Sequence, residues 1–176
     1  TPLYSSAASD VYKRQIEANS EAALQGIFFL KDNNTSNNKT FVKHLAEDCK
    51  SNQVYKGILN DRSKATYFSN THVDQVAQKT EGYQLSKGIL LSDNASYFSK
   101  PELKIYADDV KCSHGSTIGP IDENAIFYLR SRGMSKIAAT KILISSFINE
   151  ELSSIDNEQM SEIIQKKLVR YLSKVK

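Results

Sequence analysis

The chain has 176 residues and a formal net charge of +3, because 23 Lys and Arg oppose 20 Asp and Glu. This near balance does not indicate a polyanion-binding protein, so we expect no nucleic acid and no membrane surface as a partner. With 40% hydrophobic residues and only 7 Gly and 3 Pro, the composition excludes collagen-like, low-complexity and wholly disordered chains and fits one or two compact domains.

The longest purely apolar run covers residues 27–30, far below the roughly 20 residues that a membrane-spanning helix needs. Only Cys49 and Cys112 are present, too few for a disulfide framework or a four-thiolate metal site, and no signal-peptide pattern is recognisable. We therefore expect a reducing, cytoplasmic location.

Residues 1–15 (TPLYSSAASDVYKRQ) are rich in Ser and Ala and keep neither a strand nor a helix period. We expect them to lie outside the fold. They resemble translated read-through of a sequencing adapter, which would make the chain a fragment lacking its true upstream portion. The alternative is a disordered N-terminus.

Residues 16–119 show short segments rich in Val, Ile, Tyr, Phe and Thr, separated by polar clusters such as DNNTSNN at 32–38. This pattern is typical of β-strands. KGILNDRSKATYFSN at 56–70 aligns with KGILLSDNASYFSK at 87–100, with an offset of 31 between Lys56 and Lys87 and of 30 between Ala65 and Ala95. A repeat of this length without crossover helices predicts a β-solenoid; the alternative is two chance hairpins in a sandwich.

Residues 120–176 have a helical period. Asp122 is a good N-cap for a helix at about 123–132, Gly133 suits its end, and Ser135 caps a second helix that reaches Glu150 and Glu151. A third helix is predicted at about 156–175. Its last turns carry several Lys and Arg, which suit the helix dipole and which we interpret as a solvated face.

The densest polar cluster, YADDVKCSHGSTIG at 106–119, lies where the strands give way to helices. In a strand, residues two apart point to the same side, so Cys112 and His114 would present a thiol and an imidazole together. Such a pair could supply half of a metal's coordination sphere. The spacing matches no common zinc motif, however, and a single Cys is more often a small buried hydrophobic residue.

The side-chain alternation also changes phase in this cluster. Leu103, Ile105 and Ala107 form one inward apolar set, whereas Val110, Cys112 and His114 have the opposite parity. A bulge or corner near residues 108–109 is therefore predicted.

Other arrangements offer little chemistry. His44 and Cys49 could form a second ligand pair or a base with its nucleophile, but a structural role is the better interpretation. No nucleophile elbow, glycine-rich phosphate loop or HEXXH motif is present, so the sequence shows no recognisable hydrolase or nucleotide site. A polysaccharide-cleaving β-helix would need paired carboxylates, and the consecutive Asp108 and Asp109 would point apart in a strand.

The runs ADDVKCSHG and FYLRSRG, together with TFVKHLAEDCKSNQVYKGIL at 40–59, closely resemble the SufB/SufD family of iron–sulfur cluster assembly proteins. KCSHG followed by Gly-Pro-Ile-Asp is similar to the SufD branch. The resemblance covers about 22–152 and lacks the family's N-terminal helical region and earlier rungs, which indicates a C-terminal fragment. It implies a right-handed parallel β-helix followed by a small helical domain.

The resemblance further implies a non-catalytic scaffold that pairs with a SufB-like subunit and binds a SufC-like ATPase, with a homodimer as another possible assembly. No tightly bound cofactor is implied, only a transient iron–sulfur cluster shared with a partner subunit. His114 matches the histidine position of that shared site, and Cys112 is a secondary candidate. An alternative is a purely structural, ATPase-docking subunit that holds no iron. Candidate partner-binding residues lie in the predicted helices: Ile126, Phe127, Tyr128, Arg130, Arg132, Ile142 and Phe147.

Overall fold

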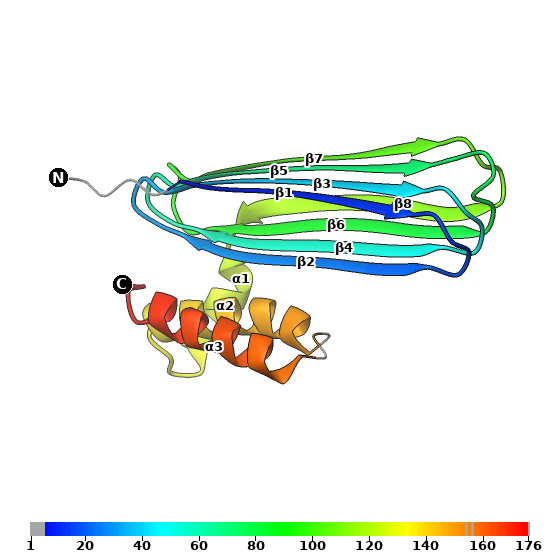
Figure 1. Ribbon diagram of the computed structural model, residues 1–176. Coiled ribbons are helices and arrows are strands. Elements are labelled where there is room, and N and C mark those ends of the chain that lie inside the picture. The colour runs from blue at the N-terminus through cyan, green and yellow to red at the C-terminus, as the bar shows by residue number, and fades with distance from the viewer. Residues whose placement is uncertain (1–5, 154, 156, 176) are drawn as a thin grey trace.

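The computed structural model describes residues 6–153, 155 and 157–175. In this part of the chain, eight strands precede three helices (Figure 1). The strands are β1 (Ser6–Gln15), β2 (Glu21–Leu30), β3 (Thr35–His44), β4 (Lys50–Leu59), β5 (Lys64–Val73), β6 (Thr80–Leu90), β7 (Ser96–Ile105) and β8 (Val110–Pro120). The helices are α1 (Glu123–Ser131), α2 (Lys136–Leu152) and α3 (Glu158–Leu172).

The strands form two parallel sheets, in the orders β1-β3-β5-β7 and β2-β4-β6-β8. Consecutive strands alternate between the sheets, so the chain winds as a solenoid of about four turns, and the helices lie beside the sheet that contains β2 and β4 (Figure 1). The predicted β-solenoid followed by helices is therefore confirmed.

The sequence repeat corresponds to neighbouring rungs of the solenoid. Lys56 of β4 pairs in register with Lys87 of β6, as the offset of 31 predicts. Ala65 of β5, in contrast, pairs with Tyr97 of β7 and not with Ala95, which lies in the corner before β7. The offset of 30 is thus wrong by two residues. A shift of two keeps every side chain on the same face, so the inward set is unchanged.

The polar clusters of the sequence form the corners between strands. Asn19, Asp32, Asp48 and Asp61 all have left-handed backbone, with φ between 57° and 60°. Asn and Asp tolerate this conformation better than other residues with side chains, which explains why the strands are separated by these polar residues.

Part of the solenoid interior is filled by aromatic rings packed against one another and against glycines. Tyr55 stacks on Tyr67 with ring centroids 4.1 Å apart. A Cβ added at Gly57 would lie 2.3 Å from Cε2 of Phe28, so the absence of a side chain at this position makes room for the ring of the neighbouring rung.

Residues 6–15 differ from the prediction that the first fifteen residues lie outside the fold. They form β1, which pairs with β3 over its whole length from Ser6 to Gln15. The alternating polar and apolar residues of this segment were too few to show a strand period on their own. Residues 1–5 lie outside the described part.

The helices begin close to the predicted positions. Asp122 accepts hydrogen bonds from the backbone N–H groups of Asn124 and Ala125, Ser135 caps α2, and Gly133 between them has a φ of 92°. The third helix is shorter than predicted, starting after its N-cap Asn157 and ending at Leu172; Asp156, the predicted start, lies outside the described residues.

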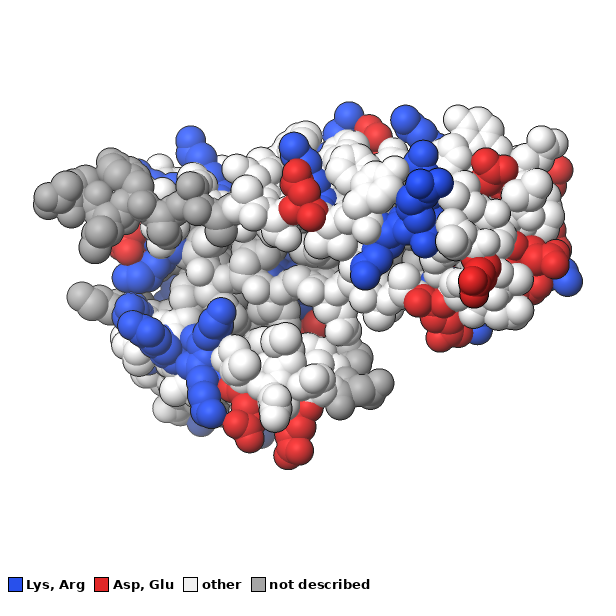
Figure 2. All heavy atoms as spheres, viewed as in Figure 1, with Lys and Arg blue, Asp and Glu red and all other residues white. Residues whose placement is uncertain are grey.

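Helices α2 and α3 cover the outer face of the second sheet. Ile144, Ile148, Leu168 and Tyr171 pack with Ile58 of β4 in one apolar cluster. Figure 2 shows charges of both signs spread over the visible face of the strands, whereas basic side chains gather at the C-terminal end of α3. No helix in the part of the chain that the structure describes has the length and apolar character of a membrane span.

Candidate functional site

The predicted corner at Asp108 and Asp109 is confirmed, since both lie in the bend between β7 and β8. From there the register of β8 on β6 is unbroken, from Thr80 with Val110 to Leu90 with Pro120. The two parity sets read from the sequence therefore belong to two different strands.

Cys112 and His114 both face the solenoid interior. A Cβ added at the inward-facing Gly82 would lie 3.2 Å from Cys112 Sγ, and one added at Gly88 would lie 3.3 Å from Cγ1 of Ile118. His114 lies between these two residues in the same strand and with the same parity, so it shares their face.

The environments of Cys112 and His114 differ strongly. Cys112 is half-buried and packs against a small cluster of Val73, Ala77 and Ala107. Desolvation by burial raises the pKa of the Cys112 thiol, while a backbone hydrogen bond with Gly82 acts in the opposite direction. The thiolate that a metal requires is therefore disfavoured at Cys112.

His114 is exposed although it faces inward. β7 pairs only with β5 and β8 only with β6, so among the described strands none stacks beyond this last rung. The inner face of the rung is consequently open, and an imidazole on it can be reached by another molecule.

A row of polar side chains lies behind His114 inside the solenoid. Gln84, the register partner of His114 on β6, donates from Nε2 to Thr71 Oγ1 at 2.7 Å. Gln53, one rung further in, donates to the same oxygen at 2.8 Å and accepts from Thr40 at 2.6 Å. These residues are buried, so His114 stands at the open end of a hydrogen-bonded interior row.

His44 and Cys49 have structural environments. His44 is fully buried, and its Nε2 lies 2.9 Å from Ser51 Oγ. Burial lowers the pKa of His44 to about 4. Cys49 is also fully buried, with its Sγ 3.4 Å from the carbonyl oxygen of Glu17. Neither group is open to a substrate.

The described residues contain no group of three or more His, Cys, Asp or Glu side chains that could hold a metal ion. Asp108 and Asp109 are both exposed in the corner, and the cleft that Asp109 lines is not lined by Asp108. His114 and Cys112 thus stay the candidate ligands of this chain.

The predicted partner-binding residues divide into exposed and buried ones. Phe127 and Tyr128 are 73% and 56% exposed, and Arg130, Arg132 and Ile142 are exposed as well. Ile126, by contrast, is only 1% exposed, and Phe147 packs within the cluster between helices and sheet. The burial of Ile126 argues against a direct contact with a partner, and the partner-binding role of these residues stays a prediction.

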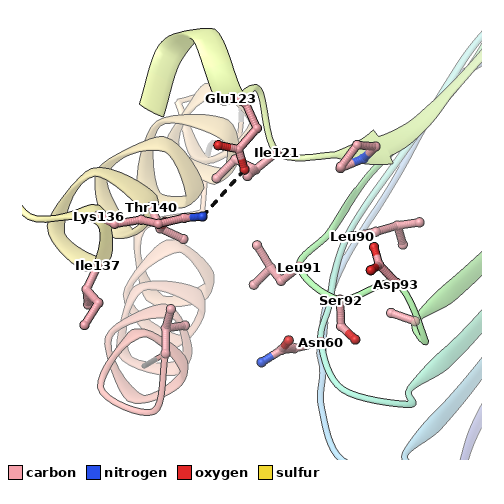
Figure 3. A pocket seen from close by; sticks show the side chains of 13 residues that line it. Asn60, Leu90, Leu91, Ser92, Asp93, Ile121, Glu123, Lys136, Ile137 and Thr140 are labelled. Atoms are coloured by element: carbon pink, nitrogen blue, oxygen red, sulfur yellow. Dashed lines mark ion pairs between the residues drawn. The ribbon is translucent and has the colours of Figure 1, made fainter. Parts of the chain in front are cut away.

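A cleft of about 560 Å³ lies between the solenoid corner at Leu91 and Ser92 and the starts of α1 and α2 (Figure 3). Its charged side chains include Lys136 and Glu123, which form an ion pair at 3.8 Å across the α1–α2 turn. Neither Cys112 nor His114 lines this cleft. It lies beside the contact between the solenoid and the helices and does not contain the candidate ligands.

The interior polar row was missed from the sequence, although a signal was present. Gln53 and Gln84 lie three residues before Lys56 and Lys87. The sequence repeat that contains KGIL therefore starts at least at these glutamines. Polar residues that recur at an inward position of a solenoid indicate a ladder of buried hydrogen bonds.

Comparison with known proteins gives one consistent result. The pattern described as "SUF system FeS cluster assembly, SufBD core domain" matches residues 5–147. The chain is 35% identical to the iron–sulfur cluster assembly protein SufD of Escherichia coli over 144 residues, which cover 82% of the chain and 34% of that protein.

Two further relatives agree. An iron–sulfur cluster assembly SufBD family protein of Synechocystis is 42% identical, over 59% of the chain and 23% of its own length. SufD of Plasmodium falciparum is 30% identical, over 86% of the chain and 10% of its own length. The chain thus spans about a third or less of these curated relatives.

Proposed function

Since the chain belongs to the SufBD core-domain family of the SUF iron–sulfur cluster assembly system, we propose that it is part of a SufD-like, non-catalytic scaffold subunit. It pairs with a SufB-like subunit through the open end of the solenoid and binds a SufC-like ATPase through α1 and α2. His114 contributes to nascent cluster assembly at the paired end.

The exposed, inward-facing imidazole of His114 carries this proposal. It sits on the last rung, where the edges of β7 and β8 have no described strand beyond them. Strand edges of this kind are templates for pairing with another chain. A partner docked there would lie beside His114, and imidazole nitrogen is a suitable ligand for iron.

The cluster is cargo, and its remaining ligands come from the partner. His114 is accessible and Cys112 is packed, so His114 is the primary ligand and Cys112 a secondary one. Distributing ligands over two subunits lets an ATP-driven rearrangement open and close the site.

The exposed aromatic and basic residues of α1 support ATPase docking. Phe127 and Tyr128 project outward beside Arg130 and Arg132. Aromatic residues and Arg are enriched at protein interfaces. A cytoplasmic location and a homodimeric form stay predictions.

One alternative is favoured by the packing of Cys112. With its thiol held in an apolar cluster, the last rung could be a purely structural end, and the subunit would then only dock the ATPase.

The two functions are separated by co-purifying the complete parent protein with its SufB-like and SufC-like partners. Wild type, His114→Ala and a control histidine variant, His72→Ala on the outer face of β5, are compared for complex recovery and for bound iron and sulfide. We expect His114→Ala to form the complex but to lose most iron and sulfide, with His72→Ala unchanged. Full retention in His114→Ala would support the structural alternative, and absence of any complex with wild type would overturn the scaffold assignment.

A further inference from the structure

The amide group of Gln84 is held in one orientation. Its Nε2 donates to Thr71 Oγ1 at 2.7 Å and also faces the backbone oxygen of Glu102 at 3.4 Å. A hydroxyl could accept or donate, but a backbone carbonyl only accepts, so the nitrogen must be on the Glu102 side. The oxygen of the amide, Oε1, consequently points away from both partners.

This oxygen is one of five buried polar side-chain atoms that have no hydrogen-bond partner among the described residues. Gln84 is only 3% exposed, and among the described residues Oε1 has no hydrogen-bond partner. A buried amide oxygen without a partner costs on the order of 1–3 kcal/mol. Gln53, the equivalent glutamine one rung further in, has both ends of its amide bonded, to Thr40 and Thr71.

His114 occupies the position next to Gln84. The two residues are direct register partners on adjacent parallel strands and face the same interior. Gln53 in turn pairs with Gln84. Gln84 therefore differs from Gln53 in two ways: no threonine donates to its Oε1, and its neighbour on the outer rung is a histidine.

We infer that Gln84 is a positioning residue. In this structure its Oε1 and the exposed His114 ring are not bonded; when the ring turns inward, Oε1 accepts a hydrogen bond from one ring N–H, which fixes the tautomer and leaves the other ring nitrogen free as the iron ligand. This deepens the proposed function and rests on it. Histidine ligands commonly donate their second N–H to a carbonyl or carboxylate group, which fixes the ring orientation and increases the basicity of the ligating nitrogen.

The rest of the row makes the acceptor rigid. Thr71 accepts from both glutamines, and Gln53 is bonded to Thr40, so the Gln84 amide cannot rotate without breaking bonds across neighbouring rungs. The acceptor is therefore already in place when the His114 ring turns toward it.

The test compares Gln84→Met with Gln53→Met in the full chain. Both changes remove a buried amide from the same row, and Gln53 loses more hydrogen bonds, so Gln53→Met controls for a structural effect. The first readout is the pair of ring ¹⁵N signals of His114 at about pH 8.5, well above the ordinary histidine pKa of about 6.5. Urea unfolding verifies that each variant folds, and Gln84→Glu, which keeps an acceptor oxygen, serves as a second variant.

We expect one tautomer of His114 in wild type, Gln53→Met and Gln84→Glu, and a mixture of tautomers in Gln84→Met. In the complex with the SufB-like and SufC-like partners, Gln84→Met should retain about tenfold less Fe²⁺ than Gln53→Met.

Unchanged ring signals in Gln84→Met would overturn the inference and leave the proposed function standing. Changed signals with undiminished iron would overturn the positioning role. If His114→Ala keeps its iron, the proposed function fails. The His114 ring signals are recorded without iron, so they test the inference about Gln84 independently of that result.

Discussion

Lys56 of β4 and Glu150 near the end of α2 form an ion pair of 2.6 Å that joins the solenoid to the helices. The Lys56 side chain is only 1% exposed. Its Nζ also donates to the carbonyl oxygen of Phe147 at 3.0 Å and lies 3.8 Å from the buried carboxylate of Glu151. The hydrogen bond from Lys56 is the main reason why the pKa of Glu150 is lowered. One buried cation thus anchors the last turn of α2.

Lys56→Met should destabilise the chain by about 3 kcal/mol, because the buried Glu151 loses its cation and the Phe147 carbonyl loses its donor. Lys87→Met is the matched control. Lys87 also pairs with Glu150, at 3.6 Å, but its side chain is 31% exposed, so we expect a loss below about 1 kcal/mol. Urea unfolding measures both values. Equal losses in the two variants would contradict the anchoring role of Lys56.

Much of the fold could be predicted because the same sequence pattern recurs in successive rungs of a solenoid. The KGIL segments identify equivalent strands, and Lys56 and Lys87 do pair. The connection after β6 (residues 91–95) is one residue longer than the one after β4 (residues 60–63), whereas the Ala65–Ala95 alignment makes it one residue shorter. This alignment therefore differs from the structure by two residues. A local sequence repeat does not show how many residues form the corner between two strands. The strand at 6–15 was missed because its partner, β3, lies 29 positions away in the chain.

The position of the candidate site could be predicted from the sequence, but the exposure and the contacts of its residues could not. Spacing alone places Cys112 and His114 on one face, and the structure agrees. Their exposure depends on which rung is last and on how β7 and the preceding corner pack, which no local pattern contains. The role of Gln84 likewise depends on contacts with Thr71 and Glu102 from other strands.

Gly57→Ala should destabilise the solenoid by about 2 kcal/mol, because the new methyl group would meet the ring of Phe28 at 2.3 Å. Gly119→Ala is the control, since a Cβ there meets nothing within 4 Å, and we expect a change within about 0.5 kcal/mol. Thermal and urea unfolding test the pair. The reduction of the Gly57→Ala loss by a second change, Phe28→Leu, would show that the ring is the cause; an unchanged loss would contradict it.

Stability should fall as the pH is lowered from about 6.5 to 4, partly through His44. Burial lowers its folded pKa from 6.5 to about 4, so in this window the unfolded chain binds a proton that the folded chain does not. The contribution of His44 to the free energy of unfolding amounts to roughly 3 kcal/mol. It is fully present above pH 6.5 and is lost by about pH 4.

His44→Gln removes this titration, and its unfolding free energy should therefore change less between pH 7 and pH 5 than that of wild type. His72→Gln, on the outer face, leaves His44 in place and should keep the wild-type dependence. Identical pH profiles for wild type and His44→Gln would show that His44 does not titrate as its burial requires.

Phe127→Ala should weaken binding of a SufC-like ATPase without destabilising the chain. The ring is 73% exposed, so its removal costs little in folding, whereas the loss of an aromatic anchor at an interface commonly costs about 2 kcal/mol of binding, or roughly thirtyfold in Kd. Ile126→Ala is the neighbouring control. Ile126 is 1% exposed and should lose about 3 kcal/mol of stability. Calorimetric titration of the complete parent protein with the ATPase, alongside urea unfolding, separates the two effects; wild-type affinity in Phe127→Ala would place the ATPase contact elsewhere on the helices.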